Sequence, residues 1–297
     1  MSIGQINIEP LTNKKNINWL KANAKYNKFC NTIEKYNLLE SINNVVFLYS
    51  GGKDATFGLY FLNKYIMNYY PEINLKAIMV TYPAHVYFEE NGEEADCFKR
   101  VREFCASQNV DLDVFTSDNQ DLTEGAVDGC KICKATRKEI LDGYLQNIGE
   151  NGKSAIVTGY TLYDILAYLD EYCLLTNFTF DMTQFTEKKI TERITNCLHK
   201  MNVKEELPGG FRIIRPLVDF KESDVVDFLN DNSIPYINRP CKVSSKKHKR
   251  IYFEALNLVE SMNNSSYEGI MDFLSKHNIE LPKTFNDIQY KFHFTDC

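Results

Sequence analysis

Residues 45–54, VVFLYSGGKD, decide the fold of this chain. The first five residues are apolar or aromatic and predict a buried strand, and the helix-like spacing at 55–68 predicts that a helix follows after a tight turn. In such a turn successive backbone N–H groups can surround an anion, and the helix dipole adds to the attraction. The glycines permit close approach, the serine offers a hydroxyl and the lysine a positive charge. The stretch therefore predicts a phosphate-binding loop made of Ser50, Gly51, Gly52, Lys53 and Asp54.

The rest of the chain alternates short β-branched runs with amphipathic stretches of helical length. Further strands are expected at 75–82, 112–117, 154–160 and 211–217, and further helices at 93–107, 131–147, 162–174, 222–229 and 245–262. An alternation of strand and helix is typical of successive βαβ units. The predicted fold class is α/β, with a doubly wound, mainly parallel sheet and the phosphate loop at the carboxyl end of its first strand.

Three segments are expected around this alternation. Residues 1–43 are interpreted as an N-terminal helical extension, and residues 44–262 as the catalytic domain. Within that domain, residues 178–210 break the alternation and are expected to form a helical insertion that could cover a site. Residues 263–297 are a weakly patterned tail to which we assign no chemistry.

Composition excludes several classes of protein. The chain is 44% hydrophobic and 25% charged, which is ordinary for a globular protein, and its formal net charge of -6 disfavours a general nucleic-acid coat. No window approaches the roughly 18 apolar residues that a membrane helix needs. The N-terminus lacks the apolar run of a secretory signal, so we expect a cytoplasmic protein with no membrane association. Its nine cysteines are an odd number and are expected to be mostly free thiols.

The phosphate loop lacks the spacing of a Walker A loop and of a dinucleotide-binding loop. Its Ser-Gly-Gly-Lys-Asp closely resembles the motif of the PP-loop ATP pyrophosphatases instead. That family cleaves ATP between the α- and β-phosphates and transfers AMP to a substrate oxygen. The resemblance implies an ATP site at the five loop residues, with Mg²⁺ helping to hold pyrophosphate. Ala55 stands where the family has Ser or Thr, so a hydroxyl contact is lost or is supplied by Thr56.

A second motif is Cys130-Lys131-Ile132-Cys133, whose C-x-x-C spacing can bring two thiolates onto one metal or cluster, or pair them as a redox dithiol. Downstream, Ile214-Arg215-Pro216-Leu217, Glu222 and Pro240-Cys241 follow in order. This order resembles the cysteine-containing tRNA thiolases of the PP-loop class, the two-thiocytidine and two-thiouridine synthetases. The resemblance implies that a [4Fe-4S] cluster is bound, with one iron open to hold the sulfide that is transferred. It also implies catalytic roles for Asp54, Cys130, Cys133 and Cys241, with the three cysteines as cluster ligands.

The cysteines allow three other interpretations. In a persulfide relay, Cys133 or Cys241 would carry the sulfur. A zinc site would need a fourth ligand, for which His248 is the only nearby candidate, and a purely structural role is the remaining alternative. The other six cysteines are interpreted as buried or bystander residues: Cys30, Cys97, Cys105, Cys173, Cys197 and Cys297.

The segment after the fourth strand departs from the family. It reads Gly159-Tyr160-Thr161-Leu162-Tyr163-Asp164, where the thiolases have Gly-His followed by paired aspartates. Only Gly159 and Asp164 match, and the resemblance implies nucleotide contacts at these two. Tyr160 and Thr161 indicate that the choice of substrate has drifted from that of the better-known members.

A basic run follows Cys241 and consists of Lys242, Lys246, Lys247, Lys249 and Arg250. At helical spacing these side chains could meet the phosphates of a tRNA strand, although a solvated helix face explains them as well. The remaining histidines lack partners at metal-ligand spacing and predict surface positions or satisfied core positions: His85, His199, His277 and His293.

Together these features predict an ATP-dependent sulfurtransferase. It would adenylate a carbonyl oxygen, on a tRNA base, and replace that oxygen with sulfur from a sulfide or persulfide carrier. One rival is a PP-loop enzyme that transfers sulfur or ammonia to a small molecule, which the acidic composition favours. A second rival is an ATP-binding sensor without turnover, for which Ala55 is the hint. The sequence leaves the oligomeric state open, a homodimer included.

Overall fold

Strand β1 (Asn44–Leu48) lies at the centre of a six-stranded sheet, with β2 on one side and β4 on the other. The computed structural model describes residues 23–82, 85–117, 129–148, 153–177, 186–207, 211–241, 248–258 and 265–282. Across the sheet the strand order is β3-β2-β1-β4-β6-β5. The remaining strands are β2 (Asn74–Thr81), β3 (Asp111–Thr116), β4 (Ser154–Val157), β5 (Lys204–Glu206) and β6 (Phe211–Ile214).

All neighbouring strands run parallel except β5, which pairs with β6 in the antiparallel direction. The chain builds outward from β1 to β3 and then returns to the other side of β1 with β4. The order therefore reverses between β1 and β4, and in sheets of this kind ligands bind in the crevice outside the carboxyl ends of the strands at such a reversal. The turn after β1 is the predicted phosphate loop.

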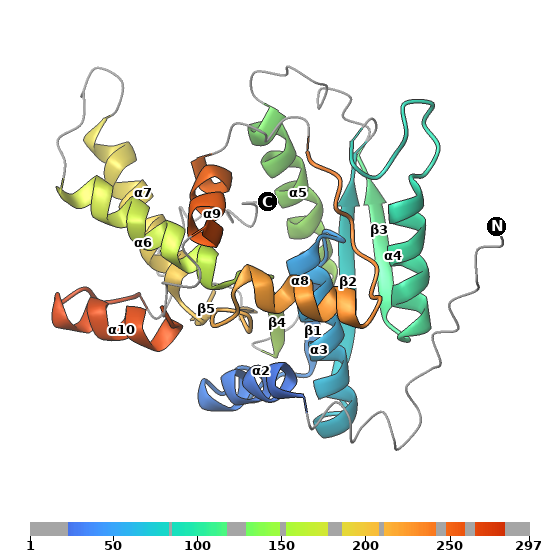
Figure 1. Cartoon of the computed structure of the whole chain (residues 1–297), viewed down its shortest axis with the longest axis horizontal. Coiled ribbons are helices and arrows are strands. Elements are labelled where there is room, and N and C mark those ends of the chain that lie inside the picture. The colour runs from blue at the N-terminus through green and yellow to red at the C-terminus, as the bar shows by residue number, and fades with distance from the viewer. Residues whose placement is uncertain are drawn as a thin grey trace.

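Helices occupy both faces of the sheet (Figure 1). Helices α6, α7 and α10 are grouped at one end of the molecule, and α4 lies at the other end beside β3. The helices are α2 (Ala24–Lys35), α3 (Lys53–Tyr69), α4 (Asp96–Ser107), α5 (Gly129–Ile148), α6 (Leu162–Asn177), α7 (Glu187–Met201), α8 (Glu222–Asp231), α9 (His248–Leu258) and α10 (Tyr267–Lys276).

The alternation of side chains along β1 divides the core in two. Val45 and Phe47 belong to the larger hydrophobic cluster, to which α3, α4 and α8 contribute. Val46 belongs to a smaller cluster on the other face, which is completed by Leu141 and Leu145 of α5. Because both of their faces are buried, the central strands β1 and β4 read as nearly continuous apolar runs, as expected for a parallel sheet.

Aromatic packing fixes α8 against α3. The ring of Phe228 lies 4.7 Å from the ring of Phe61 and 5.4 Å from that of Phe57, measured between centroids. Such pairs add roughly 0.5–1.5 kcal/mol each to the stabilisation from burial alone. The contact places the first residue of α8, Glu222, near the first residue of α3, Lys53.

The predicted α/β class and the mainly parallel sheet are confirmed. Two elements were not expected. Strand β5 lies within the span interpreted as a helical insertion, of which residues 187–201 are helical, and helix α10 lies in the tail that showed little pattern. Among the residues that the structure describes, no helix is both long enough and apolar enough to cross a membrane.

Candidate functional site

The phosphate loop joins β1 to α3 through a turn that only glycine tolerates well. Gly51 has a φ of +74°, in the left-handed region that side chains other than glycine rarely adopt. Gly52 precedes the first residue of α3 and makes no side-chain capping bond among the described residues, while the Ser50 hydroxyl oxygen accepts from the Gly52 N–H at 3.3 Å. An uncapped helix N-terminus next to such a turn can receive an anion.

Two distant segments hold the carbonyl groups of this loop. The Tyr87 hydroxyl donates to the Ser50 carbonyl at 3.3 Å, and the Ile237 N–H donates to the Gly51 carbonyl at 2.7 Å. A Cβ added at Gly51 would lie 2.6 Å from Ile237 Cδ1. The loop is therefore braced by the segment after β2 and by the segment after α8.

Thr56 acts on the loop from inside. It is fully buried, and its hydroxyl lies 3.3 Å from the Gly51 carbonyl and 3.1 Å from the Tyr49 hydroxyl. In this position Thr56 supports the turn, and its contact with ATP stays a prediction. Ala55 is also buried, directly beneath the loop that follows β4.

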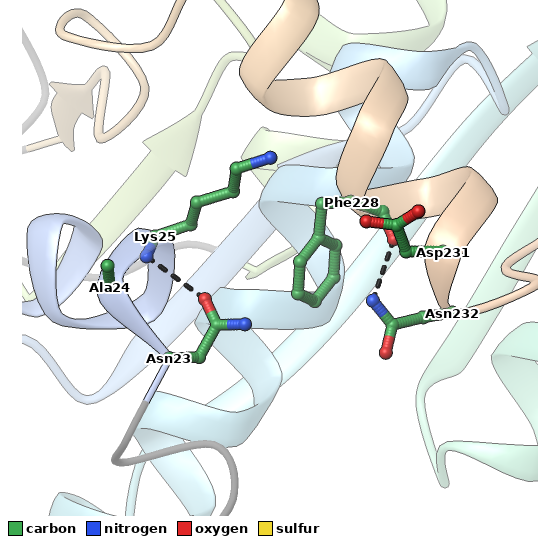
Figure 2. A pocket seen from close by; sticks show the side chains of 6 residues that line it. All are labelled: Asn23, Ala24, Lys25, Phe228, Asp231 and Asn232. Carbon is green, nitrogen blue, oxygen red and sulfur yellow. Dashed lines mark hydrogen bonds between the residues drawn. The ribbon is translucent and has the colours of Figure 1, made fainter.

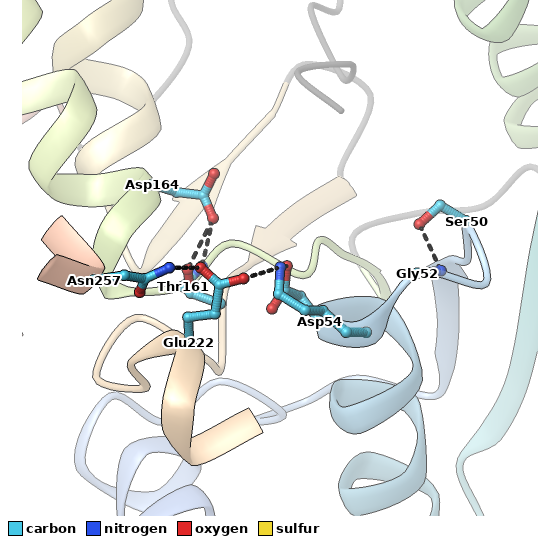
Figure 3. Close-up of polar contacts among 8 residues, drawn as sticks. Ser50, Gly52, Asp54, Thr161, Asp164, Glu222 and Asn257 are labelled. Atoms are coloured by element: carbon cyan, nitrogen blue, oxygen red, sulfur yellow. Dashed lines mark hydrogen bonds and ion pairs between the residues drawn. The ribbon is translucent and has the colours of Figure 1, made fainter. Parts of the chain in front are cut away.

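The side chains of Asp54 and Glu222 approach each other at the start of α3 (Figure 3), and both contact Lys53. Its Nζ lies 3.1 Å from Asp54 Oδ2 and 3.3 Å from Glu222 Oε1. The other oxygen of Glu222 accepts a hydrogen bond of 2.7 Å from the Asn257 side chain of α9. Glu222 therefore links the lysine of the phosphate loop to the helix that follows the cysteine and the basic run.

These charged groups shift one another's pKa values. Burial opposes the charge on Lys53, but Asp54 and Glu222 more than offset that penalty and raise the pKa of the lysine. The pKa of Asp54 is also raised, first by burial and then by the nearby carboxylates of Asp164 and Glu222, against the lowering effect of Lys53. Asp54 and Glu222 thus share one lysine at the N-terminus of α3, and the Asp164 carboxylate adds negative charge near Asp54, so the local charge favours a further cation.

The loop after β4 packs against the phosphate loop, as the reversal of the sheet requires. A Cβ added at Gly159 would lie 3.3 Å from the Ala55 nitrogen and 3.4 Å from the Asp54 carbonyl carbon. Asp164 accepts from the backbone N–H of Thr161 at 2.8 Å and from its hydroxyl at 3.1 Å, which caps α6. The structure thus brings Gly159 and Asp164 to the phosphate loop, while their contacts with a nucleotide stay predictions.

Tyr160 and Thr161, where the sequence departs from the thiolase pattern, have structural contacts. The ring of Tyr160 is almost fully buried, stacks on Tyr168 with 5.9 Å between centroids, and lies 5.5 Å from the guanidinium carbon of Arg215. Arg215, at the end of β6, also donates to the Asn202 carbonyl at 2.6 Å. The departure therefore fills the space after β4 with a packed aromatic side chain.

Cys133 and Cys241 lie at the two ends of one aromatic pair. The Tyr82 hydroxyl donates to the Cys133 carbonyl at 2.8 Å, and the ring of Tyr82 contacts the ring of His85 edge to face, 5.9 Å between centroids. The Nε2 atom of His85 lies 3.2 Å from Cys241 Sγ. The second and third predicted cysteines thus approach the same place, beyond the carboxyl end of β2.

Cys130 lies in the first turn of α5, one turn before Cys133, and its side chain lies outside the described residues. Among the side chains that are described, no group of three or more Cys, His, Asp or Glu is gathered closely enough to hold one metal ion. The set of three cysteines stays a prediction, because the side chain of one member is not among those described.

His85 was expected at the surface or satisfied in the core, and it is half-buried with Cys241 as its partner. Its partner is 156 residues away in the sequence, so no local spacing could reveal it. His199 is buried in the core and bonds Glu205, and His277 is exposed, as expected. His293 lies outside the described residues.

The basic run is only partly described. Lys242, Lys246 and Lys247 lie outside the described residues, and Lys249 and Arg250 lie in α9 with side chains that are not described. Their predicted contact with tRNA stays a prediction.

A pocket of about 470 Å³ lies between α2 and the end of α8 (Figure 2). Its lining includes Asn23, whose side chain caps α2, and Asn232, whose side chain donates to the Phe228 carbonyl. Glu222 begins α8 and Asp231 ends it, so the pocket is roughly 13 Å along the helix from the phosphate loop, at 1.5 Å per residue. The pocket is separate from the phosphate loop, and we assign it no chemistry.

With this geometry, the chain can be compared with solved structures. It superposes on the U34-tRNA thiolase NcsA from Methanococcus maripaludis, which carries a [4Fe-4S] cluster, with a TM-score of 0.59 and 20% sequence identity over 88% of this chain and 84% of the thiolase chain. The two chains share a fold. This agrees with the resemblance inferred from the motifs.

Two other solved structures superpose much less closely on this chain. One is the NH3-dependent NAD synthetase from Campylobacter jejuni in complex with nitrate, with a TM-score of 0.39 and 12% sequence identity over 88% of this chain and 97% of that chain. The other is the FMN adenylyltransferase from Candida glabrata in complex with FMN and AMPCPP, with a TM-score of 0.38 and 15% sequence identity over 74% of this chain and 60% of that chain. No protein-family model matches the sequence, and no curated protein matches it.

Sequence reasoning missed four residues that the geometry brings to the site. They are Tyr82, His85, Tyr87 and Asn257. The signal for the first three is their position directly after β2, because the carboxyl ends of parallel strands meet at one edge of the sheet. Asn257 carried no such signal, because its contact depends on how α9 packs.

Proposed function

We propose that this protein is an ATP-dependent sulfurtransferase of the PP-loop type that acts on a carbonyl oxygen of a tRNA base. The observation that carries the proposal is the double bracing of the phosphate loop. Tyr87 and Ile237, which hold the carbonyls of Ser50 and Gly51, lie on the same two segments as His85 and Cys241. A site for ATP and a site for sulfur chemistry would thus share one wall.

The phosphate loop would bind the polyphosphate of ATP through the first turn of α3. Lys53 would leave Asp54 and Glu222 for the phosphates, because the phosphate charge exceeds that of the carboxylates and the loop N–H groups add donors. Lys53 would then stabilise charge that develops when the bond between the α- and β-phosphates breaks.

Mg²⁺ fits the chemistry of this site. Asp54 and Glu222 offer the carboxylate oxygens that Mg²⁺ prefers, and together with the phosphates they could provide its ligands. The raised pKa of Asp54 reflects burial together with crowding by Asp164 and Glu222, and a divalent cation would relieve that crowding. The resting ion pairs with Lys53 would be exchanged for contacts with the metal.

The cysteines fit a [4Fe-4S] cluster by donor chemistry, since thiolates are its usual protein ligands, and the backbone of Cys133 and the sulfur of Cys241 contact the neighbouring side chains of Tyr82 and His85. When bound, such a cluster supplies an iron that can hold the sulfur to be transferred. The residues around it would position Cys241 and shield the site from water. The carbonyl oxygen of the base would attack the α-phosphorus and release pyrophosphate, and sulfur would then attack the activated carbon and release AMP.

Pyrophosphate release tests the activity. The purified protein is incubated with ATP and Mg²⁺, alone and with bulk tRNA, and pyrophosphate and thiolated nucleosides are measured. We expect release that depends on tRNA and is accompanied by a new thionucleoside. Release of equal rate without RNA would instead support transfer to a small molecule, and tight ATP binding without release would support a sensor.

Metal content tests the cysteine assignment. Iron and sulfide are quantified per chain after anoxic purification of the wild type and of Cys130→Ala, Cys133→Ala and Cys241→Ala. Cys173→Ala is a matched control, because Cys173 is a half-buried cysteine of α6 that the proposal does not use. We expect loss of the cluster in the first three variants and full content in the control. A wild type without iron, or a complete cluster in any of the three variants, would refute the assignment.

A further inference from the structure

His85 and Cys241 come from segments that are far apart in the chain and meet at hydrogen-bond distance. The imidazole Nε2 lies 3.2 Å from the Cys241 sulfur. The His85 ring is flanked by two tyrosine rings, Tyr82 at 5.9 Å and Tyr87 at 5.7 Å between centroids. This aromatic surrounding limits the orientations that the imidazole can adopt.

A separate ion pair joins the two segments. Arg239 donates through both terminal nitrogens to the carboxylate of Glu89, at 2.8 and 3.2 Å. Glu89 is four residues from His85, and Arg239 is two residues from Cys241. The pair is exposed and therefore adds little stability, but its bidentate geometry helps to set the relative orientation of the two segments that carry the nitrogen–sulfur contact.

The direction of the contact follows from the chemistry of its two atoms. A thiolate that ligates iron has no hydrogen, so only the histidine can donate. The Nδ1 atom of His85 is buried and finds no hydrogen-bond partner among the described residues. Leaving a buried N–H unpaired is costly, so the favoured neutral tautomer carries its hydrogen on Nε2, where it faces the sulfur.

The distance between His85 Nε2 and Cys241 Sγ also excludes His85 as a ligand of a fourth iron. In a [4Fe-4S] cluster each iron takes one protein ligand, so two atoms only 3.2 Å apart cannot both be ligands of separate irons. His85 is therefore a neighbour of the ligand Cys241 and not the ligand of a fourth iron.

We propose that His85 is a positioning residue that donates an N–H···S hydrogen bond to Cys241 and thereby raises the reduction potential of the cluster; this rests on the function proposed above. A one-electron reduction adds negative charge to the cluster and its sulfurs. A hydrogen bond to one of those sulfurs stabilises the reduced form more than the oxidised form.

The expected effect of losing this bond is about tenfold in the ratio of reduced to oxidised cluster at a fixed solution potential, or about 59 mV for a one-electron couple. The reduction potential of the variant should be lower than that of the wild type. The sulfide content should not change, because no ligand is removed.

The test uses His85→Phe, which keeps an aromatic ring between Tyr82 and Tyr87 but has no N–H, and His85→Gln, which restores a donor. His277→Phe is the control, since His277 is an exposed histidine at the end of α10. The anoxically purified proteins are titrated with dithionite at one pH, and the reduced cluster is followed by electron paramagnetic resonance. Iron and sulfide are measured on the same samples.

We expect the potential of His85→Phe to fall by the stated amount, that of His85→Gln to return most of the way, and that of His277→Phe to equal the wild type. A full cluster with an unchanged potential in His85→Phe would overturn the inference and leave the proposed function intact. Should His85→Phe fail to keep its cluster, retention by His85→Gln supports the hydrogen bond, and loss in both variants refutes it. A wild type without iron refutes the proposed function as well.

Discussion

Replacing Gly159 by alanine should weaken both the fold and the binding of ATP. The added Cβ would lie 3.3 Å from the Ala55 nitrogen and 3.4 Å from the Asp54 carbonyl carbon, closer than the roughly 3.5–4.0 Å at which such atoms attract each other best. Because these are backbone atoms of the first turn of α3, the helix itself must move by a few tenths of an ångström. Overpacking of this kind costs about 1–3 kcal/mol, and we expect a value near the lower end.

The same movement displaces the N–H groups that would contact phosphate. Hydrogen bonds to a charged group contribute about 1.5–3 kcal/mol each, so a shift of a few tenths of an ångström that costs about 1.4 kcal/mol in total should weaken ATP binding roughly tenfold. Urea unfolding gives the change in stability, and isothermal titration calorimetry with ATP and Mg²⁺ gives the change in affinity.

The matched control is Gly143→Ala. Gly143 lies in α5, and among the described residues an added Cβ there meets no atom within 4 Å apart from the backbone of its own helix. The same chemical change should therefore stabilise the protein by about 0.5–1 kcal/mol, through helix propensity, and leave ATP affinity unchanged. If Gly159→Ala binds ATP as tightly as the wild type and unfolds no earlier, the contact between the two loops does not position the phosphate loop.

Three further changes test the charges around α3. Lys64 is buried beside the ring of Tyr60, and burial lowers its pKa from 10.5 to about 8, so the wild type should lose stability as pH falls from 10.5 towards 8. Lys64→Met should remove that loss and raise the free energy of unfolding by up to about 3 kcal/mol at neutral pH, as measured by urea unfolding. A pH profile of stability that is the same in the variant as in the wild type would contradict this. Glu222→Gln should bind ATP about twofold to fivefold more tightly in EDTA, since a carboxylate no longer competes with phosphate for Lys53, and calorimetry showing weaker binding would argue against that competition. Because the pKa of Asp54 is raised in the folded state, stability falls as pH rises from 3.8 to that pKa. Asp54→Asn should therefore unfold at a higher urea concentration than the wild type at neutral pH, and this gain in stability should shrink as the solution is acidified. A gain that grows on acidification would contradict the raised pKa.

Much of the fold was predictable because the strands are buried on both faces. The expected strand at 45–49 is β1, and the expected helix at 131–147 is α5, which begins two residues earlier. Such runs carry their own signal, since burial on both sides requires apolar residues throughout. Strand β5 carries none, because Lys204–Glu206 is a charged triplet that becomes a strand only by pairing with β6.

Helix α10 could have been found. Ser266 caps it by accepting from the Gly269 N–H, and its buried residues recur at helical spacing as Tyr267, Ile270 and Leu274. The interpretation of residues 263–297 as a weakly patterned tail gave too little weight to the ten residues of α10. Their packing against the rest of the core is a tertiary contact that spacing alone does not locate.

The candidate site also has a part that the sequence predicts and a part that depends on tertiary contacts. The five residues of the phosphate loop are contiguous, so their turn could be predicted from the residue types. The contact between His85 and Cys241 joins positions 156 residues apart, and the link from Lys53 through Glu222 to Asn257 joins three helices. Neither contact has a local pattern. The first depends on which segments meet at one edge of the sheet, and the second depends on how α8 and α9 pack.

The bracing of the phosphate loop by Tyr87 and Ile237 has a thermodynamic consequence. Those two contacts join the loop to the segments that carry His85 and Cys241, so a shift at one is expected to change the free energy of the other. Coupling of this kind is reciprocal: the factor by which a filled cysteine site strengthens ATP binding is the factor by which ATP strengthens retention of whatever the cysteines hold. Bound ATP would then slow the loss of the proposed cluster, so the rate at which a chelator removes iron would report how much of the protein has ATP bound.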